Sequence, residues 1–149
     1  MRSGLDGARL IPFPRTASLT VRRVERARFS TWLDAYQRAW RTPGTDWLAY
    51  LFTPGATYSM GPFEPTAEGL DAIAELWERE REGHDEVFRM EHEVVAVDGD
   101  VGVVRVEVWY GDPVTRHYRD LWIVHLDEHG LCTAFEEWPF WPEKGVTPP

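Results

Sequence analysis

Residues 86–138, EVFRMEHEVVAVDGDVGVVRVEVWYGDPVTRHYRDLWIVHLDEHGLCTAFEEW, decide the fold. Apolar and polar residues alternate along four segments of this stretch, and a period of two is typical of strands. We predict the strands at residues 86–97, 101–110, 116–126 and 131–138. Turn sequences separate them: Asp98-Gly99, Gly-Asp-Pro at 111–113, and a four-residue turn at 127–130 that ends on glycine. The stretch therefore predicts a meander of antiparallel strands.

Before this stretch the apolar residues follow a helical period. The first apolar stripe consists of Phe29, Leu33, Tyr36 and Trp40. We expect this helix to begin near Glu25 and to stop at the Thr-Pro-Gly sequence 42–44. A short helix up to Tyr50, a strand at 56–60 and a third helix from Gly69 should follow. Its buried stripe would include Leu70, Ile73 and Trp77.

Helices followed by an antiparallel meander predict an α+β domain. We expect a long curved antiparallel sheet with the N-terminal helices packed on its concave face, which leaves a cone-shaped space between them. Residues 1–24 lack periodicity and are predicted to be a tail or strap. Residues 25–142 would form one domain, and residues 143–149 a C-terminal tail.

Composition narrows the classes of function. The chain has 149 residues, 43% of them hydrophobic, and a formal net charge of −9. Such a charge argues against nucleic acid as a partner. No apolar run is long enough to span a membrane or to be a secretory signal, so we expect a cytoplasmic protein. Cys132 is the single cysteine, so an internal disulfide is excluded.

The sequence offers no motif for a bound cofactor. It contains no phosphate-binding loop, dinucleotide fingerprint or nucleophile elbow. The histidines outside the first long strand are not spaced as zinc ligands are; they are His84, His117, His125 and His129. We therefore expect neither a metal nor an organic cofactor.

Four segments resemble a known superfamily. They are AYQRAWRTPGTDWLAYLFTPGATYSM at 35–60, GLDAIAELW at 69–77, YRDLWIVHLDEHG at 118–130 and FEEWP at 135–139. They are similar to the nuclear transport factor 2-like superfamily, in particular its SnoaL-like branch, over residues 29–142. The resemblance implies the cone-shaped fold and a homodimer. The superfamily includes ketosteroid isomerase, scytalone dehydratase, polyketide cyclases, limonene epoxide hydrolase and non-catalytic binding proteins, so it implies no single activity.

The resemblance carries over to single residues unevenly. Tyr36 matches the helical tyrosine that ketosteroid isomerase uses as an oxyanion donor. Met60 occupies the position of the general base of that enzyme, and methionine cannot accept a proton. Trp122 lies where the isomerase has its protonated aspartate, with Asp120 two residues earlier on the same face. Elsewhere in the superfamily a strand histidine works with an aspartate of the first helix, and His92 with Asp34 are the candidates for that pair.

The residues themselves supply further candidates. His92 alternates with Phe88 and Met90, so an imidazole would face the concave side, either as a general base or as a hydrogen-bonded core histidine. Asp120 shares a face with Trp122, either as a cavity acid or in an ion pair with Arg105 or Arg119.

Neighbouring strand positions give two more expectations. Adjacent strand residues point to opposite faces, so only one of Glu136 and Glu137 can reach the cavity; we favour Glu137, although both could be solvated. Arg105, Glu107 and Trp109 form a mixed face that would meet solvent or a second subunit.

Two functions remain open. The first is a cofactor-independent acid–base enzyme of the isomerase, dehydratase or cyclase type that acts on a small apolar or aromatic molecule. Its predicted catalytic residues are His92, Asp120 and Tyr36. Its predicted pocket consists of Trp40, Met60, Phe88, Met90, Trp122 and Glu137. The second is a non-catalytic ligand-binding or dimerisation module of the same fold, which Met60 favours.

Overall fold

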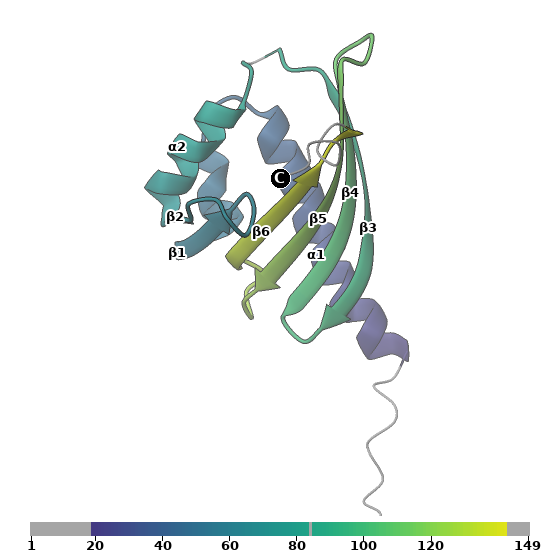
Figure 1. Ribbon diagram of the computed structural model, residues 1–149. Helices are drawn as coiled ribbons and strands as arrows, with labels where there is room; N and C mark the ends of the chain where they lie inside the picture. Colours follow the sequence, from purple (N-terminus) through teal and green to yellow (C-terminus); the bar gives the residue numbers. More distant parts are fainter. Residues whose placement is uncertain (1–18, 84, 143–149) are drawn as a thin grey trace, which may run out of the picture.

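The computed structural model describes residues 19–83 and 85–142. The predicted C-terminal tail and residues 1–18 of the predicted N-terminal tail or strap lie outside them. The helices are α1 (Leu19–Arg41), the short 3-10 helix η1 (Asp46–Tyr50) and α2 (Leu70–Glu80). The strands are β1 (Phe52–Ser59), β2 (Ala67–Glu68), β3 (Phe88–Asp98), β4 (Val101–Tyr110), β5 (Arg116–Leu126) and β6 (Cys132–Phe140). They form one curved, open sheet in the order β2-β1-β6-β5-β4-β3, with α1 running along one face (Figure 1). The molecule therefore has the predicted α+β architecture.

The meander is confirmed, but the sheet is mixed rather than wholly antiparallel. Strands β3 to β6 pair antiparallel in chain order. Strand β1, however, pairs parallel with β6, and the two-residue strand β2 pairs antiparallel with β1. Because β1 and β6 are far apart in the sequence, no turn between them could have signalled this pairing. It brings the N-terminal strand next to the last strand of the meander.

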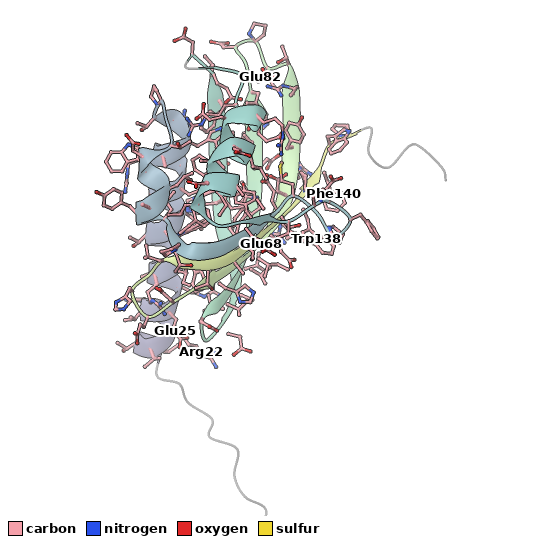
Figure 2. The ribbon with its side chains drawn as sticks, turned by 90° about the vertical axis from the view of Figure 1, so that its left-hand side faces the viewer. Arg22, Glu25, Glu68, Glu82, Trp138 and Phe140 are labelled. Atoms are coloured by element: carbon pink, nitrogen blue, oxygen red, sulfur yellow. The ribbon has the colours of Figure 1, made fainter. Side chains whose placement is uncertain are left out.

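Helix α1 begins at Leu19, earlier than the predicted start near Glu25. The extra residues extend beyond the sheet, and the apolar ones among them, Leu19, Val21 and Val24, are exposed. Arg22 and Glu25 mark this end of the molecule, opposite the end that carries Glu82 (Figure 2). The first turns bury no apolar stripe, so the sequence gives no helical period there.

The core lies between α1, α2 and the concave face of the sheet. Fully buried side chains from these three layers meet there, including Phe29, Leu33, Ile73, Trp77, Val104, Val106 and Phe135. Burying each such side chain contributes about 1.5–3 kcal/mol. Gly102 of β4 permits the closest approach, because a Cβ on it would lie 2.5 Å from the Phe29 ring. α1 can therefore pack directly against the sheet at that point.

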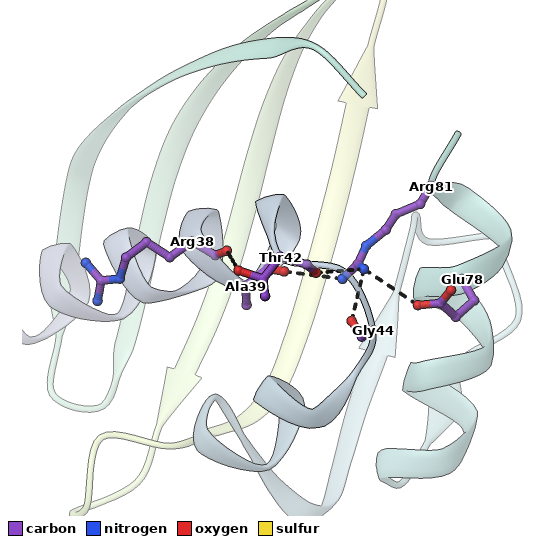
Figure 3. A network of polar contacts seen from close by, with 6 residues as sticks. All are labelled: Arg38, Ala39, Thr42, Gly44, Glu78 and Arg81. Carbon is purple, nitrogen blue, oxygen red and sulfur yellow. Dashed lines mark hydrogen bonds and ion pairs between the residues drawn. The ribbon is translucent and has the colours of Figure 1, made fainter. Parts of the chain in front are cut away.

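The end of α1 is joined to α2 by Arg81, which directly follows α2 (Figure 3). Its Nη1 donates hydrogen bonds to the carbonyl oxygens of Thr42 and Gly44 at 3.0 and 2.9 Å, and its Nη2 donates one to that of Ala39 at 3.3 Å. The last carbonyl groups of a helix have no partner within the helix. Arg81 binds one of these, that of Ala39, and two carbonyl groups of the segment that follows α1, and Glu78 lies 3.6 Å from its Nη1. We call these five residues the Arg81 cluster.

Among the residues described, no helix is long and apolar enough to cross a membrane.

Candidate active site

A cavity of about 390 Å³ lies between α1, α2 and the concave face of the sheet. Such a volume is within the range of small-molecule sites. The described residues that line it are Tyr36, Trp40, Tyr58, Met60, Glu64, Leu76, Glu80, Glu86, Phe88, Met90, Val108, Tyr110, Arg116, Tyr118, Asp120, Trp122, Glu137, Pro139 and Trp141. Most of these side chains are aromatic or acidic, so the lining combines apolar surface with titratable groups.

Two phenols connect α1 to the sheet inside this cavity. The hydroxyl groups of Tyr36 and Tyr58 lie 2.8 Å apart in a hydrogen bond, and the Tyr58 hydroxyl donates to Oε2 of Glu137 at 3.2 Å. Burial raises the pKa of both tyrosines well above the ordinary value. Both phenols are therefore neutral hydrogen-bond donors at physiological pH.

The phenols lead to a pair of carboxyl groups on adjacent strands, Asp120 of β5 and Glu137 of β6. Asp120 is only 4% exposed, and the indole Nε1 of Trp122 donates a hydrogen bond to its Oδ2 at 3.4 Å. Burial raises the pKa of Glu137 well above its usual range, and the charge of Asp120 and a hydrogen bond between the two side chains raise it further. Glu137 therefore holds a proton when Asp120 is charged.

The parity of β6 explains why Glu137 and not its neighbour reaches the cavity. Glu137 pairs with Trp122 across the sheet, on the concave side. Glu136 is exposed and accepts a hydrogen bond from the indole Nε1 of Trp138 at 3.2 Å. The preference for Glu137 thus agrees with its position in the structure.

The structure brings most of the predicted site residues together. Tyr36 and Asp120 line the cavity, as do all the predicted pocket residues: Trp40, Met60, Phe88, Met90, Trp122 and Glu137. The two arginines proposed as alternative partners of Asp120 lie on the other face of the sheet, where Arg105 binds Glu93 and Arg119 binds Glu107. That outer face is the one predicted to meet solvent or a second subunit, and homodimer formation stays a prediction.

His92 lies elsewhere. It is not among the described residues that line the cavity; its Nε2 is 3.9 Å from Oδ1 of Asp34 on α1. The predicted parity is right, since His92 faces α1 as Phe88 and Met90 face the cavity. The described lining from β3 ends at Met90, and beyond that point α1 contacts β3 through Arg26, which donates a hydrogen bond to the carbonyl oxygen of Val94, and through Asp34 beside His92. The arrangement matches the histidine–aspartate pair of the resemblance, at a position outside the cavity.

Tyr58, Tyr110 and Glu86 were not identified from the sequence. Tyr58 reaches the site because β1 pairs parallel with β6, a contact between segments that are distant in the chain. Tyr110 is the last residue of β4, and Glu86 lies in the loop before β3. Burial raises the pKa of both side chains. The alternation along 101–110 gave one usable signal, since it places Tyr110 on the same face as Val108.

The described part of the chain contains no group of three or more His, Cys, Asp or Glu side chains that could hold a metal ion. The titratable groups that meet in the cavity are carboxyls and phenols. They can donate and accept protons and hydrogen bonds, which suits acid–base chemistry.

Comparisons with known proteins agree with this geometry. The model of a family described as SnoaL-like domain matches residues 33–134. A solved protein from Kribbella flavida assigned as a ketosteroid isomerase is 20% identical, with a TM-score of 0.60, over 85% of this chain and 84% of that one. A protein from Sinorhizobium meliloti assigned as a polyketide cyclase is 21% identical, with a TM-score of 0.55, over 72% and 93%.

A third solved structure with a similar fold has no known function. A nuclear transport factor 2-like protein of unknown function from Burkholderia xenovorans is 13% identical, with a TM-score of 0.62, over 80% of this chain and 88% of that one. A search of the curated proteins finds no match. At these identities the solved structures show a shared fold: an α+β cone with N-terminal helices.

Proposed function

The chain belongs to the SnoaL-like domain family, and on this premise we propose that it is a cofactor-independent acid–base enzyme of the isomerase, dehydratase or cyclase type. Its substrate would be a small molecule with an apolar body that fits the cavity between α1 and the sheet. Asp120 would act as the base and Glu137 as the acid. Tyr36 would support Glu137 through Tyr58.

The observation that carries the proposal is the hydrogen-bonded chain Tyr36–Tyr58–Glu137–Asp120. Two neighbouring carboxyl groups whose proton affinities are pushed apart can serve as an acid and a base at the same pH. The Asp120 carboxylate would remove a proton from a carbon next to a carbonyl group. Glu137 would give its proton, or a hydrogen bond, to the carbonyl oxygen, where negative charge develops. Return of a proton to the same or another carbon completes an isomerisation without any cofactor.

Exchange of carbon-bound hydrogen tests this chemistry without knowledge of the natural substrate. Small cyclic ketones such as cyclohexanone would be incubated in D₂O with the protein, and deuterium at the α-carbon measured by NMR. We expect the wild-type protein to accelerate the exchange. Asp120→Asn and Glu137→Gln should each lower the rate at least about 100-fold, as expected for loss of a general acid or base.

Glu136→Gln is the matched control, because it makes the same chemical change one residue away on the outer face. It should keep the wild-type rate. Equal rates in all four proteins would refute the acid–base proposal, provided that circular dichroism shows the variants folded.

One observation favours the second function, ligand binding without turnover. Met60 lines the cavity at the position where the isomerase has its base, so the site lacks that group. On this alternative the carboxyl pair would orient a ligand through hydrogen bonds. Saturable ligand binding by a protein that accelerates no exchange would favour it.

A further inference from the structure

Carboxyl groups outnumber basic groups among the described residues that line the cavity. Its described carboxyl side chains are Glu64, Glu80, Glu86, Asp120 and Glu137. Among the described lining residues, the basic side chain is Arg116. Its Nη2 is 2.8 Å from Oε2 of Glu82, and its guanidinium lies over the ring of Tyr110, 4.6 Å from the centroid. Arg116 thus pairs with Glu82, a carboxylate outside the lining, and its charge also acts on the lining carboxylate Glu86.

The carboxyl groups lie at two depths. Asp120 and Glu137 form the hydrogen-bonded pair inside the cavity, and together they carry one negative charge when they share a proton. Glu64 and Glu80 are exposed and Glu86 is partly buried, so these three form an outer acidic rim. Burial raises the pKa of Glu86, whereas the positive charges of Arg116 and Arg81 lower it. A positive group in this position would regain part of the interaction that these carboxylates lose with water.

The aromatic side chains of the lining suit a cation as well. They are Tyr36, Trp40, Tyr58, Phe88, Tyr110, Tyr118, Trp122 and Trp141. The face of an aromatic ring attracts a cation within about 6 Å of its centroid. Three of these rings already have a guanidinium group of the protein over one face, so a ligand cation would need their other faces or the remaining rings. Arg41 lies 3.8 Å from the Phe88 centroid, Arg81 lies 5.3 Å from that of Trp40, and Arg116 lies over Tyr110.

We propose that the ligand of this cavity is a small organic cation: an ammonium compound with an apolar body, held between the aromatic rings and the acidic rim. Neutral apolar molecules gain nothing from the rim carboxylates, and anions are repelled by them. This inference names the class of substrate for the proposed function, and any reaction of the cation rests on that function. The binding of the cation rests only on the lining.

Three probes of matched shape separate charge from size. Choline carries a quaternary ammonium group, 3,3-dimethylbutan-1-ol replaces that nitrogen by carbon, and 3,3-dimethylbutanoate carries a negative charge instead. Each would be titrated into the full-length protein, with the indole N–H signals of the tryptophans followed by NMR. We expect choline to bind about tenfold more tightly than the alcohol, with weaker binding still for the anion.

Substitutions in the acidic rim test whether its carboxylates cause the preference for a cation. Glu80→Gln combined with Glu86→Gln should weaken choline binding about fivefold and leave the alcohol unchanged, because only the cation feels the lost charges. Glu91→Gln is the control, since Glu91 is an exposed acid of β3 on the outer face. It should change neither affinity.

Equal affinities for choline and the alcohol, tighter binding of the anion, or no saturable binding of choline would each overturn the cation inference. The ketone exchange assay keeps this failure apart from failure of the proposed function. If ketone exchange depends on Glu137 but choline binds no more tightly than the alcohol, only the cation inference is refuted. A cation preference in a protein that exchanges no ketone would refute only the catalytic proposal.

Discussion

Two buried polar groups of residues lie close to the cavity, and they differ in what faces their charges. In the Arg81 cluster, a guanidinium whose side chain is 8% exposed donates to three backbone carbonyl oxygens and lies near Glu78 (Figure 3). In the Asp120–Glu137 pair, two acidic groups face each other and an open cavity. Backbone carbonyl groups hold the guanidinium in place, whereas burial and the charge of Asp120 raise the pKa of Glu137. The main-chain partners of both terminal nitrogens favour a structural role for Arg81, whereas titratable acids that face a cavity are candidates for chemistry.

The largest expected effect is on the free energy of unfolding, and it tests the structural role of the Arg81 cluster. Arg81→Met should lower the free energy of unfolding by about 3 kcal/mol, because the variant removes charged hydrogen bonds from a buried site. Urea denaturation followed by tryptophan fluorescence measures it. Arg79→Met is the control on the same helix, since its side chain is 68% exposed and its ion pair with Glu80 is weak; it should stay within about 0.5 kcal/mol of wild type.

If Arg81→Met does not fold, Arg81→Lys provides a second measurement. Lysine keeps the charge but cannot reach three separate carbonyl groups with a rigid fork. Its stability should therefore lie between those of wild type and Arg81→Met. An Arg81→Lys protein as stable as the Arg79→Met control would contradict the structural role of the cluster.

The next prediction tests the raised pKa of Glu137 through the pH dependence of the free energy of unfolding. The pKa of Glu137 is raised in the folded protein, so between the ordinary carboxyl value and the raised one the folded state binds a proton that the unfolded chain has released. Wild-type stability should therefore fall as the pH rises through this window. Glu137→Gln removes this loss, and its stability relative to wild type should rise with pH by at most about 1.4 kcal/mol per unit.

Urea denaturation at a series of pH values from 5 to 8 measures this difference. Glu136→Gln, which changes the exposed neighbour, should show a difference from wild type that is flat with pH. A flat difference for Glu137→Gln as well would mean that Glu137 is ionised in the folded protein. It would then be no acid, and the contrast with the Arg81 cluster would disappear.

Local patterns predicted the parts of the molecule that local physics determines. Strands β4 and β5 have the predicted bounds, because their alternation and the turns on either side are unambiguous. The same alternation placed Asp120 and Trp122 on the buried face. The pairing of β1 with β6 depends on segments that are distant in the chain, so Tyr58 was missed. The raised pKa of Glu137 could not be predicted either, because it depends on burial in the folded protein and on the charge of Asp120 in another strand.

His92 shows where parity alone is insufficient. Alternation correctly turned its imidazole toward the helices, but it could not say whether a cavity or a helix lies opposite. The answer depends on the close contact of Phe29 with Gly102, which seats α1 on the sheet next to β3. One face of a strand can therefore line a cavity at some positions and pack against a helix at others. Sequence alternation predicts the face, and only the three-dimensional structure shows which positions do which.

The smallest expected effect concerns His92, which forms with Asp34 a third polar pair to set beside the Arg81 cluster and the Asp120–Glu137 pair. The imidazole lies 3.9 Å from the Asp34 carboxylate, whose side chain is 59% exposed, so water screens the interaction. His92→Gln should change the free energy of unfolding by no more than about 0.5 kcal/mol. It should also keep ketone exchange within about twofold of wild type, because the group does not touch the cavity. A loss of exchange as large as that of Asp120→Asn would contradict this expectation. It would place the reacting groups between α1 and β3, where the histidine–aspartate pair of the superfamily would be the base.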